Sequence, residues 1–437
     1  MGRRRCRQRA SSRRVQPAVK PPAAGTQPLV EGELNSAMRS TEHPPTGLAA
    51  NRKRIPRLPV LGWQALGGKK AAGTPCLLDH ANLKFTTSGR ASILLALKML
   101  RIREGDGVLV PSYHCPSMIA PVVAQGARPI FYPIGPSGGP LLDWLQALDT
   151  ARVKVILAVH YFGLPQPMAL LRRWCDTNNV ALIEDCAHAL FGASGDRPMG
   201  SWGDLSVGSL TKFMPVPEGG VLVTNARAAA LPLLHRRTVR AQVKSVVDIV
   251  DIAVQFHRLA GLNTILRTGL GAVRAVQARM RTSQSHQPLN GTPLDDVHGE
   301  INLDLCQQTP TMASRWVAQI VPRQRIVARR RRHFEALVRA FRERVLLRPL
   351  VTSLPDQCAP YVFPLWVAHP DPGYAELRRR GIPVFRWDRL WDGARSIPGD
   401  VGVEWSHHIL QIGCHQDLTD GDLDAMVDGI LELFDRV

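Results

Sequence analysis

The stretch Val180-Ala-Leu-Ile-Glu-Asp185-Cys-Ala-His188 decides the fold class of this chain. It begins with an apolar run of strand length and delivers a carboxylate, that of Asp185, where the run ends. In open parallel sheets, ligands bind outside the carboxyl ends of the strands. Asp185 is therefore a candidate site residue, although an aspartate that caps the next turn explains this segment, taken alone, at least as well.

Apolar runs of similar length flank this stretch and alternate with segments of helical periodicity. Such alternation is typical of an α/β fold with a mostly parallel sheet sandwiched by helices. The predicted strands cover residues 107–111, 128–132, 153–160, 180–184, 205–209 and 220–224. The predicted helices cover residues 89–101, 117–125 and 167–178.

The composition divides the chain into three regions. Residues 1–50 are rich in Arg, Pro, Ala and Ser without apolar periodicity, which predicts a disordered basic tail. Residues 51–300 hold the predicted strands and are expected to form a large α/β domain. Within it, residues 226–300 form a basic helical segment that ends in a polar loop near 282–298. Residues 301–437 are expected to form a small α+β C-terminal domain.

The C-terminal region should contain a long basic helix around residues 314–343, a strand at 360–367 and a final helix at 418–434. We expect Arg329–Arg332 to lie on the solvated face of the long helix. Trp387 is expected to pack inside the small domain.

The formal charge of +19 is concentrated in two blocks. Residues 1–20 hold eight basic residues and no acidic one, and residues 226–282 hold ten basic residues against two acidic ones. Such blocks can attract nucleic acid or anionic lipid. No nucleic-acid recognition motif accompanies the charge, so nucleic-acid binding is the minor hypothesis.

The sequence lacks the features of a membrane or metal-binding protein. It has no stretch of roughly 18 uncharged apolar residues, and no apolar core follows its Arg-rich start. Its eight cysteines form no CxxC pair, so neither a metal site nor a redox pair is predicted. We therefore predict a cytoplasmic protein without membrane association.

Lys212 lies between two predicted apolar strands, in the segment Ser209-Leu-Thr-Lys212-Phe-Met-Pro215. No acidic residue lies within five positions of it. A lysine that is desolvated in such a turn has a lowered pKa and becomes an amine nucleophile, as Schiff-base chemistry requires. Without the Asp185 segment, a surface-loop lysine would be the better interpretation.

A third segment, Thr86-Thr-Ser-Gly-Arg90, leads directly into a predicted helix. Small hydroxyl residues and a glycine at a helix N-terminus offer backbone N–H groups and the positive end of the helix dipole, which together bind phosphate. Taken alone, Ser88 is equally an ordinary N-cap. Combined, the three segments supply a phosphate cradle, a carboxylate and an amine, the groups that pyridoxal phosphate (PLP) needs.

These motifs and several others resemble the DegT/DnrJ family of sugar aminotransferases, a branch of the fold-type-I PLP enzymes. The resemblance covers residues 84–225 strongly and 300–435 weakly. It implies a seven-stranded sheet, a smaller C-terminal domain and a homodimer with sites at the subunit interface. The motifs are Ser88-Gly-Arg-Ala91, Val110-Pro-Ser-Tyr113, Val159-His-Tyr-Phe-Gly163, Ile183-Glu-Asp-Cys-Ala-His188, Gly200-Ser-Trp-Gly-Asp204, Lys212 with Glu218-Gly-Gly220, and Ile409-Leu-Gln-Ile412 with His415-Gln-Asp-Leu418.

The resemblance also implies a role for each candidate residue. Lys212 would bind the cofactor covalently, Asp185 would pair with its ring nitrogen, and His188 would lie beside the ring. The cofactor's phosphate would be held by four residues: Ser88, Gly89, Arg90 and Ser209.

One further role concerns stacking on the cofactor ring. Members of this family carry an aromatic residue at the position of Cys115, and here His114 or Tyr113 is expected to supply that ring.

The resemblance implies a reaction that moves an amino group, from glutamate, to a keto-sugar such as a nucleotide-linked sugar. The setting would be polysaccharide or secondary-metabolite biosynthesis. A PLP-dependent lyase, dehydratase or enzyme with another acceptor is the alternative, favoured by the short loop between Asp204 and Lys212 and by Cys115. The retained lysine argues against the dehydratases that carry histidine instead. A non-enzymatic nucleic-acid-binding protein is the third hypothesis.

Overall fold

The computed structural model describes residues 54–66, 74–225, 232–269, 271, 301–394 and 397–435 of the 437-residue chain. The tail predicted for residues 1–50 and the polar loop predicted near 282–298 lie outside these ranges. Within them, no helix combines the length and the apolar character needed to cross a membrane.

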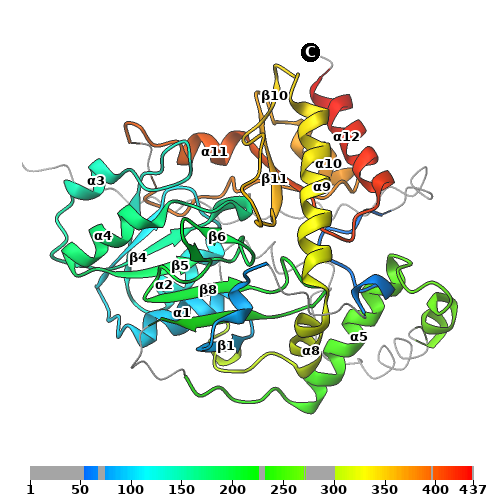
Figure 1. The fold of residues 1–437 in the computed structure, drawn as a ribbon, viewed down its shortest axis with the longest axis horizontal. Coiled ribbons are helices and arrows are strands. Elements are labelled where there is room, and N and C mark those ends of the chain that lie inside the picture. Colours follow the sequence, from blue (N-terminus) through cyan, green and yellow to red (C-terminus); the bar gives the residue numbers. More distant parts are fainter. Residues whose placement is uncertain are drawn as a thin grey trace, which may run out of the picture. The chain divides into compact units, whose positions relative to one another are not determined.

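The larger sheet has seven strands in the order β1-β9-β8-β5-β4-β2-β3 (Figure 1). The five neighbours from β8 to β3 are parallel, while β9 runs antiparallel to both β8 and β1. The predicted mostly parallel, seven-stranded α/β sheet is thereby confirmed. The strands are β1 (Leu83–Thr86), β2 (Gly107–Pro111), β3 (Arg128–Tyr132), β4 (Val153–Val159), β5 (Ala181–Asp185), β8 (Leu205–Ser209) and β9 (Gly220–Thr224).

Helices cover this sheet on both faces. Every residue of β2, β8 and β9 is buried, which is why these strands read as continuous apolar runs in the sequence. Helix α1 (Gly89–Met99) packs against β8, β9 and α2 (Pro116–Ala124), and α4 (Met168–Asn178) packs against β5. The remaining elements here are α3 (Leu142–Gln146), the hairpin of β6 (Ala193–Ser194) and β7 (Arg197–Pro198), and the short 3-10 turns η1 (Trp63–Ala65), η2 (Leu77–Asp79) and η3 (Tyr161–Gly163).

The C-terminal part is built on a second, antiparallel sheet with the strand order β10-β11-β13-β12. Helix α9 packs on β10 and β11, and α12 lies alongside α9 (Figure 1). Together they enclose a separate apolar core around Phe334 and Phe363. The elements are α9 (Arg323–Phe341), β10 (Leu347–Pro349), β11 (Val362–Val367), α10 (Gly373–Arg379), β12 (Val384–Phe385), α11 (Gly402–His408), β13 (Ile409–Gly413) and α12 (Asp420–Phe434).

The long basic helix predicted around residues 314–343 is in fact two helices, α8 (Met312–Ile320) and α9. Pro322 separates them because a proline lacks the N–H that would continue the helix and forces the preceding residue out of helical geometry. Val321 accordingly has φ −61° and ψ 130°. The predicted helix was therefore wrong in its continuity.

The burial of Arg330 differs from a second expectation for this region. It is fully buried, although the run Arg329–Arg332 was expected on a solvated face. It lies four residues from both Ile326 and Phe334, which are buried on the same side of α9. Helical periodicity therefore places it on the apolar stripe of the helix.

The basic segment after β9 contains helix α5 (Val239–Gln255). Thr238 caps its N-terminus by accepting a hydrogen bond from the N–H of Ala241. It packs against α8, where Ser245 and Ser314 bring their hydroxyl oxygens within 3.5 Å. A one-turn helix, α7 (Leu303–Cys306), precedes α8.

Two buried histidines with lowered pKa values, His415 and His114, are expected to make the fold sensitive to acid. His415 donates from Nε2 to the carbonyl of Pro56 (3.0 Å) and accepts at Nδ1 from the N–H of Asp417 (3.3 Å). Burial lowers the pKa of His415 to about 3 and that of His114 to about 4. As the pH falls below about 6.5, the unfolded chain binds protons that the folded chain rejects, so stability is lost down to the folded-state pKa.

We expect a His415→Gln variant to lose less stability on acidification than the wild type. One neutral histidine contributes about 1.4 kcal/mol per pH unit to the fall in the free energy of unfolding between about pH 6 and pH 4. Urea unfolding at a series of pH values in that window measures this slope. The exposed His369, changed to Gln, is the control and should keep the wild-type slope. An unchanged slope for His415→Gln would contradict the prediction.

Candidate active site

The residues predicted to carry the chemistry meet where β5 and β8 end. These strands are neighbours and parallel, so their carboxyl ends lie at the same edge of the sheet. Asp185 is the last residue of β5, and Lys212 follows the end of β8 by three positions. The strand pairing therefore brings together two groups that are far apart in the sequence.

Lys212 is half-buried as a residue, and protein atoms surround its amine. Its Nζ lies 5.1 Å from the centroid of the Tyr361 ring. Burial lowers the pKa of the Lys212 amine, and the negative charges of an ionised Cys115 and of the Asp185 carboxylate would oppose that shift. A larger neutral fraction at neutral pH makes this lysine a better nucleophile than a surface lysine.

Asp185 is buried and faces the same space. Its Oδ1 accepts a hydrogen bond from the N–H of Ala187 at 2.8 Å. Burial raises the pKa of the Asp185 carboxyl, while the Ala187 N–H and the Lys212 amine work in the opposite direction. A cationic partner for this carboxylate would therefore be stabilised strongly in such surroundings.

His188 stands as a neutral imidazole next to this pair. Its Nδ1 accepts the N–H of Phe162 (3.3 Å), so Nε2 carries the hydrogen. Its ring contacts those of Tyr361 and Trp387, with centroid distances of 4.5 and 5.2 Å. Burial lowers the pKa of His188 well below the usual value, and the positive charge of Lys212 acts in the same direction.

The residues predicted to hold the phosphate lie close together around the start of α1. Ser88 caps the helix by accepting the N–H of Ala91 at 3.1 Å. Gly89 faces Ser209, because a Cβ built on Gly89 would lie 3.6 Å from the Ser209 Cβ. Gly220 approaches the same turn so closely that a Cβ there would lie 2.3 Å from the carbonyl carbon of Ser88. Arg90, the second residue of α1, follows directly. The start of α1 and the end of β8 thus face one another.

The contacts described for the His114 ring are with residues other than Lys212. Its Nδ1 lies 3.0 Å from the carbonyl of Pro111, and its Nε2 accepts the N–H of Trp391 at 2.9 Å. Its ring stacks on Phe131, with centroids 5.0 Å apart. The neighbouring Cys115, in contrast, acts electrostatically on Lys212. Stacking of His114 on a cofactor stays a prediction that these contacts do not support.

Two aromatic residues from the C-terminal part were missed by the sequence reasoning. Tyr361 is buried against Lys212 and His188. Trp387, expected inside the small domain, instead packs on His188 and on Tyr113, whose ring centroid is 5.0 Å away, against the core of the large sheet. No local pattern marks either residue, since their contacts join segments more than 100 residues apart.

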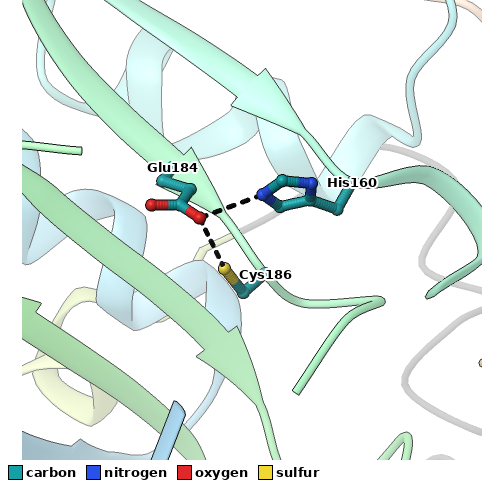
Figure 2. Close-up of side chains that lie close together, drawn as sticks. All are labelled: His160, Glu184 and Cys186. Carbon is teal, nitrogen blue, oxygen red and sulfur yellow. Dashed lines mark hydrogen bonds and ion pairs between the residues drawn. The ribbon is translucent and has the colours of Figure 1, made fainter. Parts of the chain in front are cut away.

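Glu184, beside Asp185 in β5, forms a separate buried cluster with His160 and Cys186 (Figure 2). Successive residues of a strand point to opposite faces, so Glu184 points away from the Asp185 side. Its Oε1 accepts from His160 Nε2 (3.0 Å) and from the N–H of Gly200 (2.8 Å). His160 Nδ1 accepts the N–H of Gln166, so Nε2 carries the donated hydrogen.

The carboxylate of Glu184 holds the loop after β7. Its Oε2 accepts the N–H groups of Trp202 (2.7 Å) and Gly203 (3.1 Å). Burial raises the pKa of Glu184, but the hydrogen bond from His160 and the backbone donors outweigh it and leave the pKa lowered. Both carboxylate oxygens of Glu184 already accept hydrogen bonds, and both ring nitrogens of His160 are engaged in hydrogen bonds, so a metal ion would have to displace these contacts. We interpret the cluster as structural support.

A Glu184→Gln variant is expected to lose about 3–5 kcal/mol of unfolding free energy, because its amide would face the donors that the carboxylate now accepts. Chemical denaturation measures the loss. The exposed Glu335, changed to Gln on α9, is the matched control and should shift stability by less than about 0.5 kcal/mol. If the two variants lose equal stability, Glu184 does not hold the loop as described.

Comparison with known proteins identifies the family of the chain. Residues 78–353 match the model of the DegT/DnrJ/EryC1/StrS aminotransferase family. GDP-perosamine synthase of Vibrio cholerae is 32% identical over 143 residues, which are 32% of this chain and 39% of that protein. L-glutamine:2-deoxy-scyllo-inosose aminotransferase of Streptoalloteichus tenebrarius is 28% identical over 220 residues, 49% of this chain and 48% of that protein. The chain spans less than half the length of these two relatives.

Among solved structures, Helicobacter pylori PseC, an aminotransferase involved in the biosynthesis of pseudoaminic acid, superimposes with a TM-score of 0.58. The superposition covers 88% of this chain and 100% of that chain at 13% identity, and it shows that the fold is shared. The family match spans more than half of the sequence and agrees with the resemblance inferred from the motifs. The chain therefore belongs to the DegT/DnrJ/EryC1/StrS aminotransferase family.

Proposed function

We propose that this chain is a PLP-dependent aminotransferase that moves an amino group from glutamate or glutamine to a keto-sugar. The observation that carries the proposal is the Lys212 amine, enclosed by Asp185, His188 and Tyr361 at the edge of the parallel sheet. Family membership supports the reaction class. The relatives named for GDP-perosamine and for an L-glutamine:inosose aminotransferase support a sugar-like acceptor.

The residues at this edge fit PLP. A buried carboxylate and a lysine with a lowered pKa face each other beside the N-terminus of α1, where a phosphate is favoured. Bound PLP would supply an electron-withdrawing ring. We propose that the phosphate is held by Ser88, Gly89, Arg90 and Ser209.

The side chains at this site would then have separate roles. Asp185 would stay charged opposite a protonated ring nitrogen, a stabilising pair at a buried position. His188 would donate from Nε2, since its Nδ1 is already used by Phe162. The Lys212 amine would carry a proton between substrate carbon and nitrogen, which its lowered pKa favours at neutral pH.

The test is an amino-donor experiment on the purified chain loaded with PLP. We expect L-glutamate or L-glutamine to change the cofactor's visible absorption and to yield the matching 2-oxo acid. If the absorption band does not change with either donor, the lyase or other-acceptor alternative would replace the aminotransferase proposal. Failure to bind PLP at all would overturn the proposal.

We also propose that the protein acts as a homodimer. Exposed apolar side chains lie on α5 and α8, including Val239 (80% exposed), Val243 and Trp316 (56% exposed). The two helices join where the N–H of Met312 donates to Gln242 Oε1 at 2.8 Å. Exposed apolar patches of this kind favour burial against a partner, and a second copy of the chain is the partner that we propose.

The dimer is tested by light scattering on a Val243→Asp, Trp316→Asp double variant. We expect the wild type to elute with twice the monomer mass and the double variant to shift toward the monomer. Val345→Asp, at a side chain that is 86% exposed outside this face, is the control and should stay dimeric. A wild type that is monomeric at all accessible concentrations would contradict the proposal.

Other features of the proposal concern organisation and setting. We propose a large PLP-binding domain over residues 51–300 and a small domain over 301–437, matching the two separate sheets. A cytoplasmic location is supported by free thiols at every described cysteine, which a reducing compartment maintains. The proposed setting is the biosynthesis of a polysaccharide or secondary metabolite.

A further inference from the structure

We infer that Arg330 is a positioning residue for Lys212, and that its buried guanidinium fixes the turn carrying the amine against the start of β11. The inference deepens the proposed function and rests on the role proposed there for Lys212. Its test reads the lysine amine directly and does not depend on cofactor chemistry.

The guanidinium of Arg330 joins three segments of the chain. Its Nη2 donates to the backbone carbonyl of Lys212 at 2.7 Å. Its Nη1 donates to the carbonyls of Pro360 (2.8 Å) and Tyr361 (3.1 Å), the residues just before β11. Its Nε donates to Oε1 of Gln416, after β13, at 2.9 Å. One planar fork therefore ties the lysine turn to the two central strands of the C-terminal sheet, before the start of β11 and after the end of β13.

The two backbones held by Arg330 belong to residues whose side chains meet. Lys212 Nζ lies over the ring of Tyr361, at 5.1 Å from its centroid. Gln416 strengthens the link, because its Nε2 donates to the carbonyl of Phe213, the residue after the lysine, at 2.8 Å. The position of the amine relative to Tyr361 is thus set by main-chain hydrogen bonds rather than by side-chain packing alone.

A buried guanidinium is costly, and this one bonds only carbonyl and amide oxygens in the contacts described above. Burial lowers the pKa of Arg330 to about 10. An apolar residue would complete the stripe of Ile326 and Phe334 on α9 without that cost. Neighbouring arginines have other hydrogen-bond partners: Arg329, for example, donates to the carbonyl of Leu418 at 2.8 Å. The hydrogen bonds to the lysine turn explain a charge at position 330.

The test measures the pKa of the Lys212 amine in the full chain without cofactor. Brief acetylation with acetic anhydride at a series of pH values, followed by mass spectrometry of the peptide containing Lys212, gives the midpoint. Arg330→Met should raise the midpoint by about one pH unit, because a released turn exposes the amine and undoes the effect of burial. Gln416→Met should raise it less. Arg329→Met, the matched control on the same helix, should keep the wild-type midpoint.

A second readout is the dissociation constant for PLP, which should rise about tenfold in Arg330→Met if the proposed function holds. A wild type that never binds PLP would end the proposed function, while the labelling result would still decide the role of Arg330. Equal midpoints in wild type and Arg330→Met, or equal shifts in Arg330→Met and Arg329→Met, would overturn the inference. So would full recovery in Arg330→Lys, which keeps the charge without the fork. If Arg330→Met does not fold, the acetylation midpoint of Lys212 in Gln416→Met is compared with that in Arg329→Met. Equal midpoints in these two variants would then overturn the inference.

Discussion

Replacing Lys212 by methionine is expected to lower the rate of amino-group transfer by about 10²–10⁴-fold, the range that a positioned acid–base group contributes. The loss follows from the amine's two proposed tasks, covalent attachment of the cofactor and transport of a proton. Neither can be performed by a thioether of similar length. The rate of 2-oxo acid release from the amino donor, followed in single-turnover experiments, measures the effect.

The same variant separates catalysis from stability. Burial disfavours the charged form of the Lys212 amine, so an apolar replacement should leave the free energy of unfolding unchanged or slightly higher. Lys98→Met, at an exposed position of α1, is the matched control and should keep both rate and stability. Borohydride reduction should attach PLP to the peptide containing Lys212 in the wild type only. A Lys212→Met variant with wild-type turnover would remove Lys212 from the mechanism.

Much of the sheet could be predicted because its signal is local. Strands buried on both faces read as apolar runs, so residues 107–111, 205–209 and 220–224 match the observed bounds of β2, β8 and β9. The predicted bounds 128–132 also match the edge strand β3, although most of its residues are only partly buried. Asp185 and Lys212 could be paired for a related reason. Each follows an apolar strand of one parallel sheet, and the carboxyl ends of such strands share an edge.

The walls of the site could not be predicted in this way. Tyr361 and Trp387 reach His188 from the C-terminal part of the chain, and nothing in their neighbouring residues reports a contact so distant in sequence. His114 was assigned by its closeness to Cys115 in the sequence. A one-residue step changes the direction of a side chain, and His114 turns to Phe131 and Trp391 instead.

Two wrong predictions for α8 and α9 could have been avoided from the sequence. Pro322 falls inside the predicted long helix, and its missing N–H marks the start of α9. Arg330 was read as part of a charged run, whereas its spacing of four from Ile326 and Phe334 marks a buried position. The charge of the run predicted an exposed side chain for Arg330, whereas the helical period predicts the buried position that is observed.

Asp185→Asn should produce the second large effect, a loss of about 10²–10³-fold in turnover, comparable to the removal of one preorganised electrostatic group from an active site. The amide can still accept the N–H of Ala187 through its oxygen, so the local backbone should be retained. What it cannot do is balance a positive charge at a buried position. Asp176→Asn, at an exposed side chain of α4, is the matched control and should leave turnover unchanged.

The direction of a second effect tests the electrostatic reasoning itself. The Asp185 carboxylate favours the protonated form of Lys212 and so raises its pKa against the effect of burial. Its removal should therefore lower the pKa of the Lys212 amine in the cofactor-free chain, opposite to the change expected for Arg330→Met. Acetylation midpoints in the two variants can be compared directly. A midpoint that rises in Asp185→Asn would mean that the carboxylate orders the lysine turn rather than acting on the amine by its charge, and the loss of turnover would then need a structural explanation.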